Sequence, residues 1–416
     1  MAKILRINTK TREASLEDIP SKYHMHGGRE LTSTILLDEV EPKCNPLGEI
    51  NKLIIATGLL AATPAPNFSR LSIGSKSILT GGIKEANVGG KGGYALGQHD
   101  IRALVLENTP NDDKVFHILI KEDGIEFLPA DDDKYLGNYP LAKKVIEKYG
   151  KDTAMISIGP AGINQMPMAS IAVLDLQNNP SRHAGRGGRG AVLGSKGIKS
   201  IIIKKPNTPK IKYTDKEAFK KIAKKWFKEL YESKRGFSKL GTALTVGVSE
   251  MLKGLPTKNF RFGSFEGAEK IGGDHLHEII VERGGKFGIP CLPGCAIQCS
   301  NLVIGPDGNH QTSSLEYETI CLNGSNLLID DIDVIARIDH ECDDIGLDTI
   351  EFGGMMGVLM ESGMFEFGEE DAIFKVLDEI RNNTKNGKLY GKGVQKVGDA
   401  LDVKRIPAVK GQGLPA

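Results

Sequence analysis

Three cysteines within nine residues carry the clearest chemical signal in the sequence. Cys291, Cys295 and Cys299 form a Cys-x3-Cys-x3-Cys run that also contains a proline and a glycine. Thiolates are soft ligands, and three on one short turn can hold three irons of a cubane cluster while a fourth ligand comes from elsewhere. The spacing fits neither a ferredoxin nor a zinc ribbon. The run therefore predicts a metal site, with buried structural thiols as the alternative.

Arginines that lie near glycines in the sequence form a second group. They occur around residue 70 and in the loop 183–190, and a further glycine-rich loop covers 79–90. Glycine lets backbone N–H groups approach a ligand closely, and a guanidinium offers paired donors to a phosphate or a heteroaromatic edge. No loop has the pattern of a nucleotide-binding motif. Together the loops predict a large anionic cofactor, whereas any single one is also consistent with an ordinary β-turn.

A third group consists of carboxylates around Gly346. Asp343 and Asp344 precede this glycine and Asp348 follows it, between two predicted helices. These side chains could accept hydrogen bonds from the amino groups of a pyrimidine ring. Aspartate at a helix end is also a common cap. Taken alone, the position favours capping.

The residues up to about 204 are predicted to be rich in strands. Short apolar pieces occur at 53–56, 103–106, 116–120 and 201–203, and Gly, Pro and Asn turns separate them. Two prolines and three lysines in 204–210 cannot continue a strand and indicate a linker.

Helical periodicity begins after this linker. Thr214 and Glu217 have the spacing of a capping box, and an amphipathic helix should follow until Gly236. Its predicted apolar face consists of Phe219, Ile222, Ala223, Trp226, Phe227 and Leu230.

Four more helices are expected in the second half, at about 330–345, 349–362, 369–382 and 393–402, whereas 406–416 should be a loop. The predicted fold class is α+β, with a β-rich N-terminal cofactor-binding domain followed by an α-helical domain. The predicted boundaries are 1–204 for the β-rich domain, 205–213 for the linker and 214–416 for the helical domain with the cysteine run.

Composition excludes several classes of function. Lysine and arginine (54) almost balance aspartate and glutamate (53) in a chain of 416 residues, so no general attraction to nucleic acid is expected. No apolar run approaches the roughly 18 residues of a membrane span, and the N-terminus lacks the apolar region of a signal peptide. We therefore expect a cytoplasmic protein with no nucleic-acid or membrane partner.

In combination, these motifs resemble the tungsten- or molybdenum-dependent aldehyde:ferredoxin oxidoreductase family over the whole sequence. The matching segments are 27–29, 56–58, 63–66, 79–90, 158–162, 184–188, the cysteine run, 316–319, 343–348 and 409–411. The resemblance implies a β-rich base for a tungsten (or molybdenum) bis-pyranopterin, helical domains that close over it and a neighbouring 4Fe-4S cluster.

The resemblance also implies roles for single residues. Cys291, Cys295 and Cys299 correspond to three cluster ligands, and Glu318 to the carboxylate near the metal that moves a proton or orients the substrate. The positions that correspond to contacts with the pterins are Arg70, Asn87, Gly89, His183, Ala184, Gly185, Arg186, Asp343, Leu347 and Asp348.

The implied reaction is oxidation of a small-molecule aldehyde to a carboxylate, with electrons passing through the cluster to ferredoxin or a similar carrier, and with a homodimer as one option for assembly. The family continues into a third helical region with the fourth cluster cysteine, so this chain is expected to be truncated. Cys44, Cys321 and Cys342 are the remaining candidates for the fourth ligand. Two alternatives are a non-catalytic cofactor-binding or interaction subunit and an unrelated iron–sulfur radical enzyme.

Overall fold

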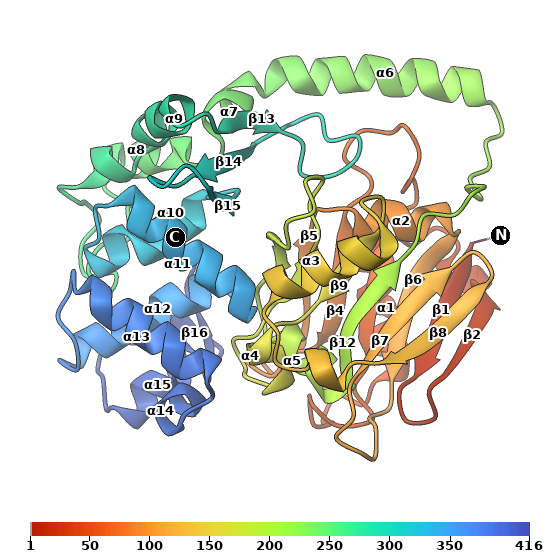
Figure 1. The fold of residues 1–416 in the computed structure, drawn as a ribbon, viewed down its shortest axis with the longest axis horizontal. Coiled ribbons are helices and arrows are strands. Elements are labelled where there is room, and N and C mark those ends of the chain that lie inside the picture. The colour runs from red at the N-terminus through yellow and green to blue at the C-terminus, as the bar shows by residue number, and fades with distance from the viewer. Residues whose placement is uncertain (1) are drawn as a thin grey trace. The chain divides into compact units, whose positions relative to one another are not determined.

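The computed structural model describes residues 2–416, which cluster into two units (Figure 1). The first unit extends to Leu230 and also includes the separate segment Cys291–Ala296. The second unit consists of Tyr231–Pro290 and Ile297–Ala416. The cysteine run is therefore divided, because Cys291 and Cys295 belong to the first unit and Cys299 to the second.

Two six-stranded sheets form the framework of the first unit. The first has the order β2-β1-β6-β3-β4-β5, and the second β11-β10-β9-β12-β7-β8. The strands of the first sheet are β1 (Lys3–Asn8), β2 (Glu13–Asp18), β3 (Leu53–Thr57), β4 (Leu71–Lys76), β5 (Ile83–Val88) and β6 (Ile101–Glu107). Those of the second are β7 (Phe116–Lys121), β8 (Gly124–Pro129), β9 (Ala154–Ser157), β10 (Ile171–Val173), β11 (Arg182–Ala184) and β12 (Ile198–Ile203). The four apolar pieces expected to be strands lie in β3, β6, β7 and β12.

The core of the first unit lies between these two sheets. Alternate residues of β1 and β3 pack together with alternate residues of β7 and β12. Helix α1 (Gly28–Glu39) covers the other face of the first sheet, and α3 (Asn138–Tyr149) covers the other face of the second. Because both faces of each central strand are covered, the strands read as continuous apolar runs.

Short helices α2 (Gly92–Gln98), α4 (Pro160–Ile163) and α5 (Arg189–Ser195) complete the first unit before α6 (Lys216–Ser233) leaves it.

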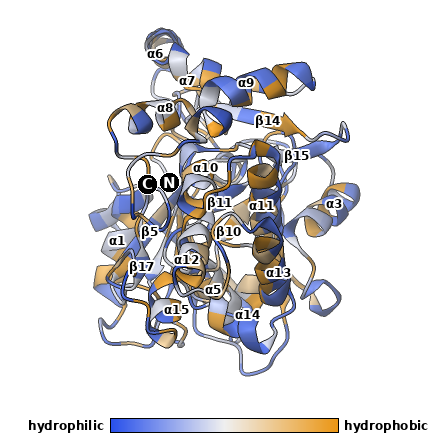
Figure 2. Cartoon of the chain, turned by 90° about the vertical axis from the view of Figure 1, so that its left-hand side faces the viewer, coloured by the Kyte–Doolittle hydropathy of each residue, from blue (hydrophilic) through white to orange (hydrophobic). Residues whose placement is uncertain are grey.

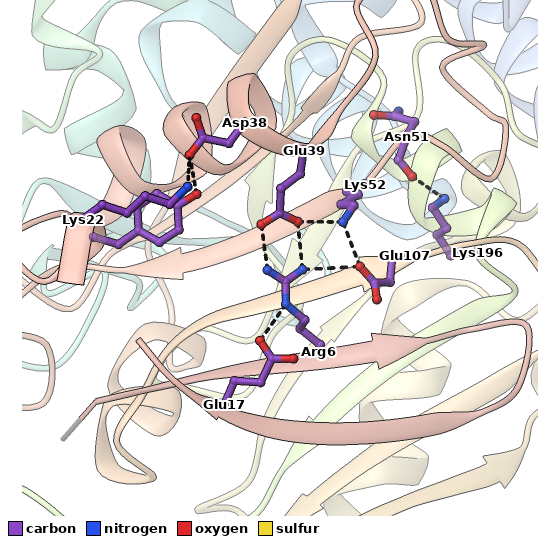
Figure 3. A network of polar contacts seen from close by, with 10 residues as sticks. Arg6, Glu17, Lys22, Asp38, Glu39, Asn51, Lys52, Glu107 and Lys196 are labelled. Atoms are coloured by element: carbon purple, nitrogen blue, oxygen red, sulfur yellow. Dashed lines mark hydrogen bonds and ion pairs between the residues drawn. The ribbon is translucent and has the colours of Figure 1, made fainter. Parts of the chain in front are cut away.

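A network of charged side chains links β1, β2 and the end of β6 to the end of α1 and to Lys52, which precedes β3 (Figure 3). Arg6 on β1 contacts Glu17 at 2.9 Å and Glu39, the last residue of α1, at 2.7 Å. Lys52 lies 2.7 Å from Glu39 and 2.9 Å from Glu107. The hydrogen bond to Glu39 raises the pKa of Arg6 above its usual value. Several partly buried charges in one network contribute more than isolated surface pairs.

The second unit is mainly helical, as the sequence predicts. The four expected helices are α11 (Ile332–Ile345), α12 (Thr349–Glu361), α13 (Glu370–Arg381) and α15 (Val394–Ala400). The unit also contains α7 (Arg235–Leu240), α8 (Leu244–Met251), α9 (Gly273–Glu282), α10 (Tyr317–Asn323) and α14 (Lys385–Tyr390). In Figure 2, α11 carries both hydrophobic and hydrophilic residues along its length, as expected for an amphipathic helix.

Two strand groups in the second unit lie outside the prediction. One is the antiparallel sheet β13-β14-β15, formed by Lys286–Ile289, Ser300–Ile304 and His310–Ser313. The other is a hairpin of β16 (Ala408–Val409) and β17 (Gln412–Gly413). The expectation of a plain loop over 406–416 is therefore wrong, because Lys410 and Gly411 both adopt positive φ and form a tight turn.

The predicted helix after the linker exists as α6, but two of its details differ. The side chain of Asp215, rather than that of Thr214, accepts the capping hydrogen bond from Ala218 N, at 2.9 Å. Within the predicted apolar face, Ala223 is buried, whereas Ile222 and Trp226 are 67% and 41% exposed. None of the helices within residues 2–416 is both long and apolar enough to cross a membrane.

Candidate functional site

Arg70 and Asn87 meet at one end of the β4–β5 pair. The two strands are antiparallel, and Ser72 lies opposite Asn87 in the register. The Asn87 side chain accepts a hydrogen bond from Nε of Arg70 and donates to Oγ of Ser72 at 3.3 Å. Strand pairing thus brings together two side chains that lie 17 residues apart.

The segment Cys291–Ala296 packs against this end of the sheet. Nη1 of Arg70 lies 3.7 Å from Sγ of Cys291, and Gly90 N donates to the Cys291 carbonyl at 2.7 Å. A Cβ at Gly89 would lie 3.0 Å from the same carbonyl oxygen. A larger residue at this position would push the cysteine segment away. Gly89 is therefore required for close approach of two backbones.

Asn67 fixes the other end of the cysteine segment. Its backbone N–H donates to the Gly294 carbonyl at 3.0 Å, and its side-chain oxygen accepts from Ala296 N at 2.8 Å. Asn67 has a φ of 66°, a region that asparagine enters more readily than most residues. Asn67 is not among the residues that the sequence motifs predict, and its only sequence signal is its place directly after the Thr63–Pro66 segment.

The Cys291 and Cys295 thiols lie 4.0 Å apart and are both buried. Their hydrogen bond, together with burial, raises the pKa of Cys291 well above the usual value, although Arg182 and Arg70 act in the opposite direction. Across residues 2–416, no three Cys, His, Asp or Glu side chains are grouped closely enough to hold a metal ion. None of the cysteines described forms a disulfide.

The predicted residues 183–186 begin on β11 and continue into the loop before α5. Nδ1 of His183 lies 2.7 Å from Oγ of Ser170, and its Nε2 lies 2.9 Å from the Pro180 carbonyl. Burial lowers the pKa of His183 to about 4. Both ring nitrogens therefore contact protein groups. Ala184 is buried, whereas Gly185 and Arg186 are half-buried.

Glu318 and Asp348 occupy the starts of two neighbouring helices in the second unit. Glu318 lies in the first turn of α10, and Asp348 is the N-cap of α12, accepting from Ile350 N at 3.1 Å. The residues that follow them, Thr319 and Thr349, have hydroxyl oxygens 2.9 Å apart. Asp348 thus has the capping role that its position favours.

The remaining predicted residues of this unit lie at the end of α11. Asp343 and Leu347 are buried, and Gly346 ends the helix in the left-handed conformation. Asp344 pairs with Arg381 of α13 at 2.7 Å. Glu318 itself accepts a hydrogen bond from Ala416 N at 2.8 Å.

The three other cysteines are buried in different places. Cys44 lies in the first unit, and its carbonyl accepts from Nζ of Lys76 at 2.7 Å. Cys321 on α10 and Cys342 on α11 are fully buried, and burial raises the pKa of both thiols. Cys342 lies on the apolar face of its helix, as expected for a core thiol.

The donor chemistry at the end of the first sheet fits the group that the sequence implies. Two thiols, a guanidinium and an exposed amide are within reach of one another around Arg70. Thiolates suit an iron–sulfur cluster, and a guanidinium suits the phosphate of a pterin cofactor.

Comparisons with known proteins identify the family. The family model described as aldehyde ferredoxin oxidoreductase, N-terminal domain, matches residues 4–205, and the model for domains 2 and 3 matches residues 218–416. A solved structure, the active-site complex BamBC of benzoyl coenzyme A reductase with 1,5-dienoyl-CoA, has a TM-score of 0.82 over 99% of this chain and 65% of that one. At 18% identity, this likeness concerns the fold alone.

Curated relatives are similar over most of the chain. The tungsten-containing aldehyde ferredoxin oxidoreductase of Pyrococcus furiosus is 34% identical over 100% of this chain and 69% of its own length. That of Thermococcus kodakarensis is 34% identical over 86% of this chain, which spans 58% of the relative's length. The WOR-like subunit of an aliphatic sulfonate oxidoreductase from Pyrococcus furiosus is 28% identical over 96% of this chain. The chain therefore belongs to the aldehyde ferredoxin oxidoreductase family.

Proposed function

We propose that the chain is the cofactor-holding part of an oxidoreductase that converts an aldehyde to a carboxylic acid. Aldehyde and water give the acid, two protons and two electrons, and the electrons leave singly to ferredoxin or a similar carrier. A tungsten (or molybdenum) bis-pyranopterin with a 4Fe-4S cluster supplies the two-electron oxidation and its division into single electrons. The single observation that carries the proposal is Arg70, which contacts both Asn87 and the Cys291 thiol.

In the first unit, Arg70, Asn87 and the backbone around Gly89 would bind the anionic edges and phosphates of the cofactor. The guanidinium of Arg70 also places a positive charge beside Cys291. A nearby cation stabilises thiolates and the negative charge of a cluster bound to them. Cys291 and Cys295, with Cys299, would supply three cluster ligands.

In the second unit, Asp343, Leu347 and Asp348 would contact one pterin, and Glu318 would orient the substrate or move a proton. Support for this assignment is the shared position of Glu318 and Asp348 at adjoining helix starts, linked by the Thr319–Thr349 contact. Carboxylates at the first turn of a helix are held in place by backbone N–H groups and by the helix dipole.

Metal analysis after anaerobic purification tests this proposal. We expect tungsten or molybdenum together with about four irons per chain, and aldehyde-dependent reduction of a viologen dye. Zinc alone, or no metal, would contradict the enzyme proposal. Bound metals without aldehyde oxidation would favour a cofactor-binding subunit instead.

Replacing one cluster ligand gives a sharper test. Cys295→Ser should abolish the broad absorbance at about 400 nm that iron–thiolate charge transfer produces. Cys342→Ala is the matched control and should keep the band, because this thiol is buried on the apolar face of α11 and is assigned to the core rather than to the fourth ligand position. A full band in the Cys295 variant would count against the ligand assignment.

A further inference from the structure

Helix α6 and the segment before it are strongly basic. Of residues 204–230, ten are lysines and three are acidic, although lysine and arginine in the whole chain barely exceed aspartate and glutamate. All six lysines of α6 are exposed. The excess positive charge of the protein is thus concentrated on one segment, which creates a local field that attracts acidic partners.

Exposed apolar side chains lie among these lysines. Ile222 and Trp226 are neighbours one helical turn apart and are 67% and 41% exposed. Lys221 and Lys225 occupy the adjoining row of the helix. A large aromatic residue surrounded by cations is typical of the centre and rim of a protein interface.

A groove of about 560 Å³ runs beside this face of α6. Leu59, Phe219 and Ile222 contribute its apolar wall. Its charged lining consists of three cations and two carboxylates: Arg102, Lys210, Lys212, Asp100 and Asp215. The wall of the groove that the linker forms is held to the first unit, because Lys210 N donates a hydrogen bond to the Gln98 carbonyl at 3.0 Å. The groove thus presents apolar groups and a net excess of one cation beside the lysine-rich face of α6.

The same face of α6 is connected to the cysteine segment. The ring of Trp226 packs edge-on against that of Phe68, with centroids 5.7 Å apart. The residue before Phe68 is Asn67, which holds Gly294 and Ala296 on either side of Cys295. Only two adjacent residues thus separate the exposed tryptophan from the segment that carries two of the proposed cluster ligands.

We propose that the lysine-rich face of α6 around Ile222 and Trp226 is the docking surface for a small acidic electron-carrier protein. The inference rests on the proposed function, since the carrier would take electrons from the cluster held by the cysteine segment. Each oxidised carrier accepts one electron, so two dockings follow the oxidation of one aldehyde. Charge complementarity selects the carrier, and the apolar contact at Trp226 stabilises the complex.

Direct binding tests the surface independently of turnover. The probe is an acidic ferredoxin with a single 4Fe-4S cluster, titrated into the 416-residue chain purified with its metals. The double variant Lys221→Glu/Lys225→Glu should raise Kd about tenfold, and added salt should weaken binding to the unsubstituted chain. Trp226 is the only tryptophan, so its emission should shift to shorter wavelength on docking.

Lys143→Glu/Lys148→Glu is the matched control. These two exposed lysines lie on α3, and the variant has the same change in net charge. Its Kd should change less than about twofold. An equal rise in Kd for both double variants would show that binding depends only on the net charge of the protein, and this would overturn the proposal.

Two further measurements separate docking from the proposed function. Viologen reduction should be unchanged in the α6 variant, whereas KM for the ferredoxin should rise with Kd.

Vesicles of equal parts phosphatidylcholine and phosphatidylserine are the alternative ligand. Binding to these vesicles without binding to ferredoxin, or binding to neither, would overturn docking. If the Kd values change as expected but the chain oxidises no aldehyde, the docking surface is supported and the proposed function is rejected.

Discussion

At the scale of single residues, His183 illustrates how burial controls protonation. Its ring lies between the Ser170 hydroxyl and the Pro180 carbonyl, and burial lowers its pKa from 6.5 to about 4. The folded protein therefore keeps this ring neutral at pH values where the unfolded chain binds a proton. The stability that this provides is fully present above pH 6.5 and is lost as the pH falls through about 4.

We expect His183→Gln to make stability less dependent on pH between 6.5 and 4. Glutamine keeps one donor and one acceptor but does not titrate. The upper limit of the effect is about 3 kcal/mol, because one pKa unit corresponds to about 1.4 kcal/mol. Denaturant unfolding at a series of pH values measures it. His275→Gln, on α9 where the histidine side chain is 42% exposed, is the control, and an identical pH profile in both variants would reject the interpretation.

At the scale of helices and strands, Glu351 holds several elements of the second unit together. It lies in the first turn of α12 and is completely buried. Its two carboxylate oxygens accept from Val394 N, at the start of α15, and from Gly413 N in β17, each at 2.9 Å. One side chain thus satisfies backbone groups of a helix and of the C-terminal hairpin.

Glu351→Ala should lower the free energy of unfolding by about 3 kcal/mol, since it leaves two buried N–H groups without an acceptor. Glu351→Gln keeps one acceptor oxygen and should cost less. Glu366→Ala, at an exposed position before α13, should change stability by less than about 0.5 kcal/mol. Thermal or denaturant unfolding of the three variants gives the comparison. Equal stability of the Glu351 and Glu366 variants would show that the buried carboxylate is dispensable.

At the scale of the whole molecule, the chain leaves the first unit after Leu230 and returns to it for only six residues, Cys291–Ala296. Gly90 and Asn67 hold this short segment by backbone and side-chain hydrogen bonds. The path of the chain therefore makes two proposed cluster ligands part of the β-rich unit, far from the first sheet in sequence.

Asn67→Gly should weaken cluster retention although all cysteines remain. Glycine tolerates the positive φ and keeps the N–H bond to Gly294, so only the acceptor for Ala296 N is lost. We expect iron to be lost several-fold faster to a chelator under anaerobic conditions. Asn178→Gly, which replaces another asparagine with positive φ, is the control. Iron loss at the control rate would show that Asn67 does not secure the cluster.

Most of the helices and central strands, and the family, follow from the sequence alone. Period and turn residues depend on near neighbours along the chain, so the apolar pieces predicted β3, β6, β7 and β12, and the helical spacing predicted α11. The hairpin of β16 and β17 was missed because strands of two residues have no measurable period.

Which residues meet across the fold depends on tertiary packing. Arg70 and Cys291 are 221 residues apart, and their contact depends on the packing of the cysteine segment against β4 and β5. Asn67 acts through its φ and through two distant backbone groups, neither of which a single sequence records. The apolar spacing of α6 likewise cannot reveal that Ile222 faces solvent, because periodicity defines a face but the packed neighbours decide whether it is covered.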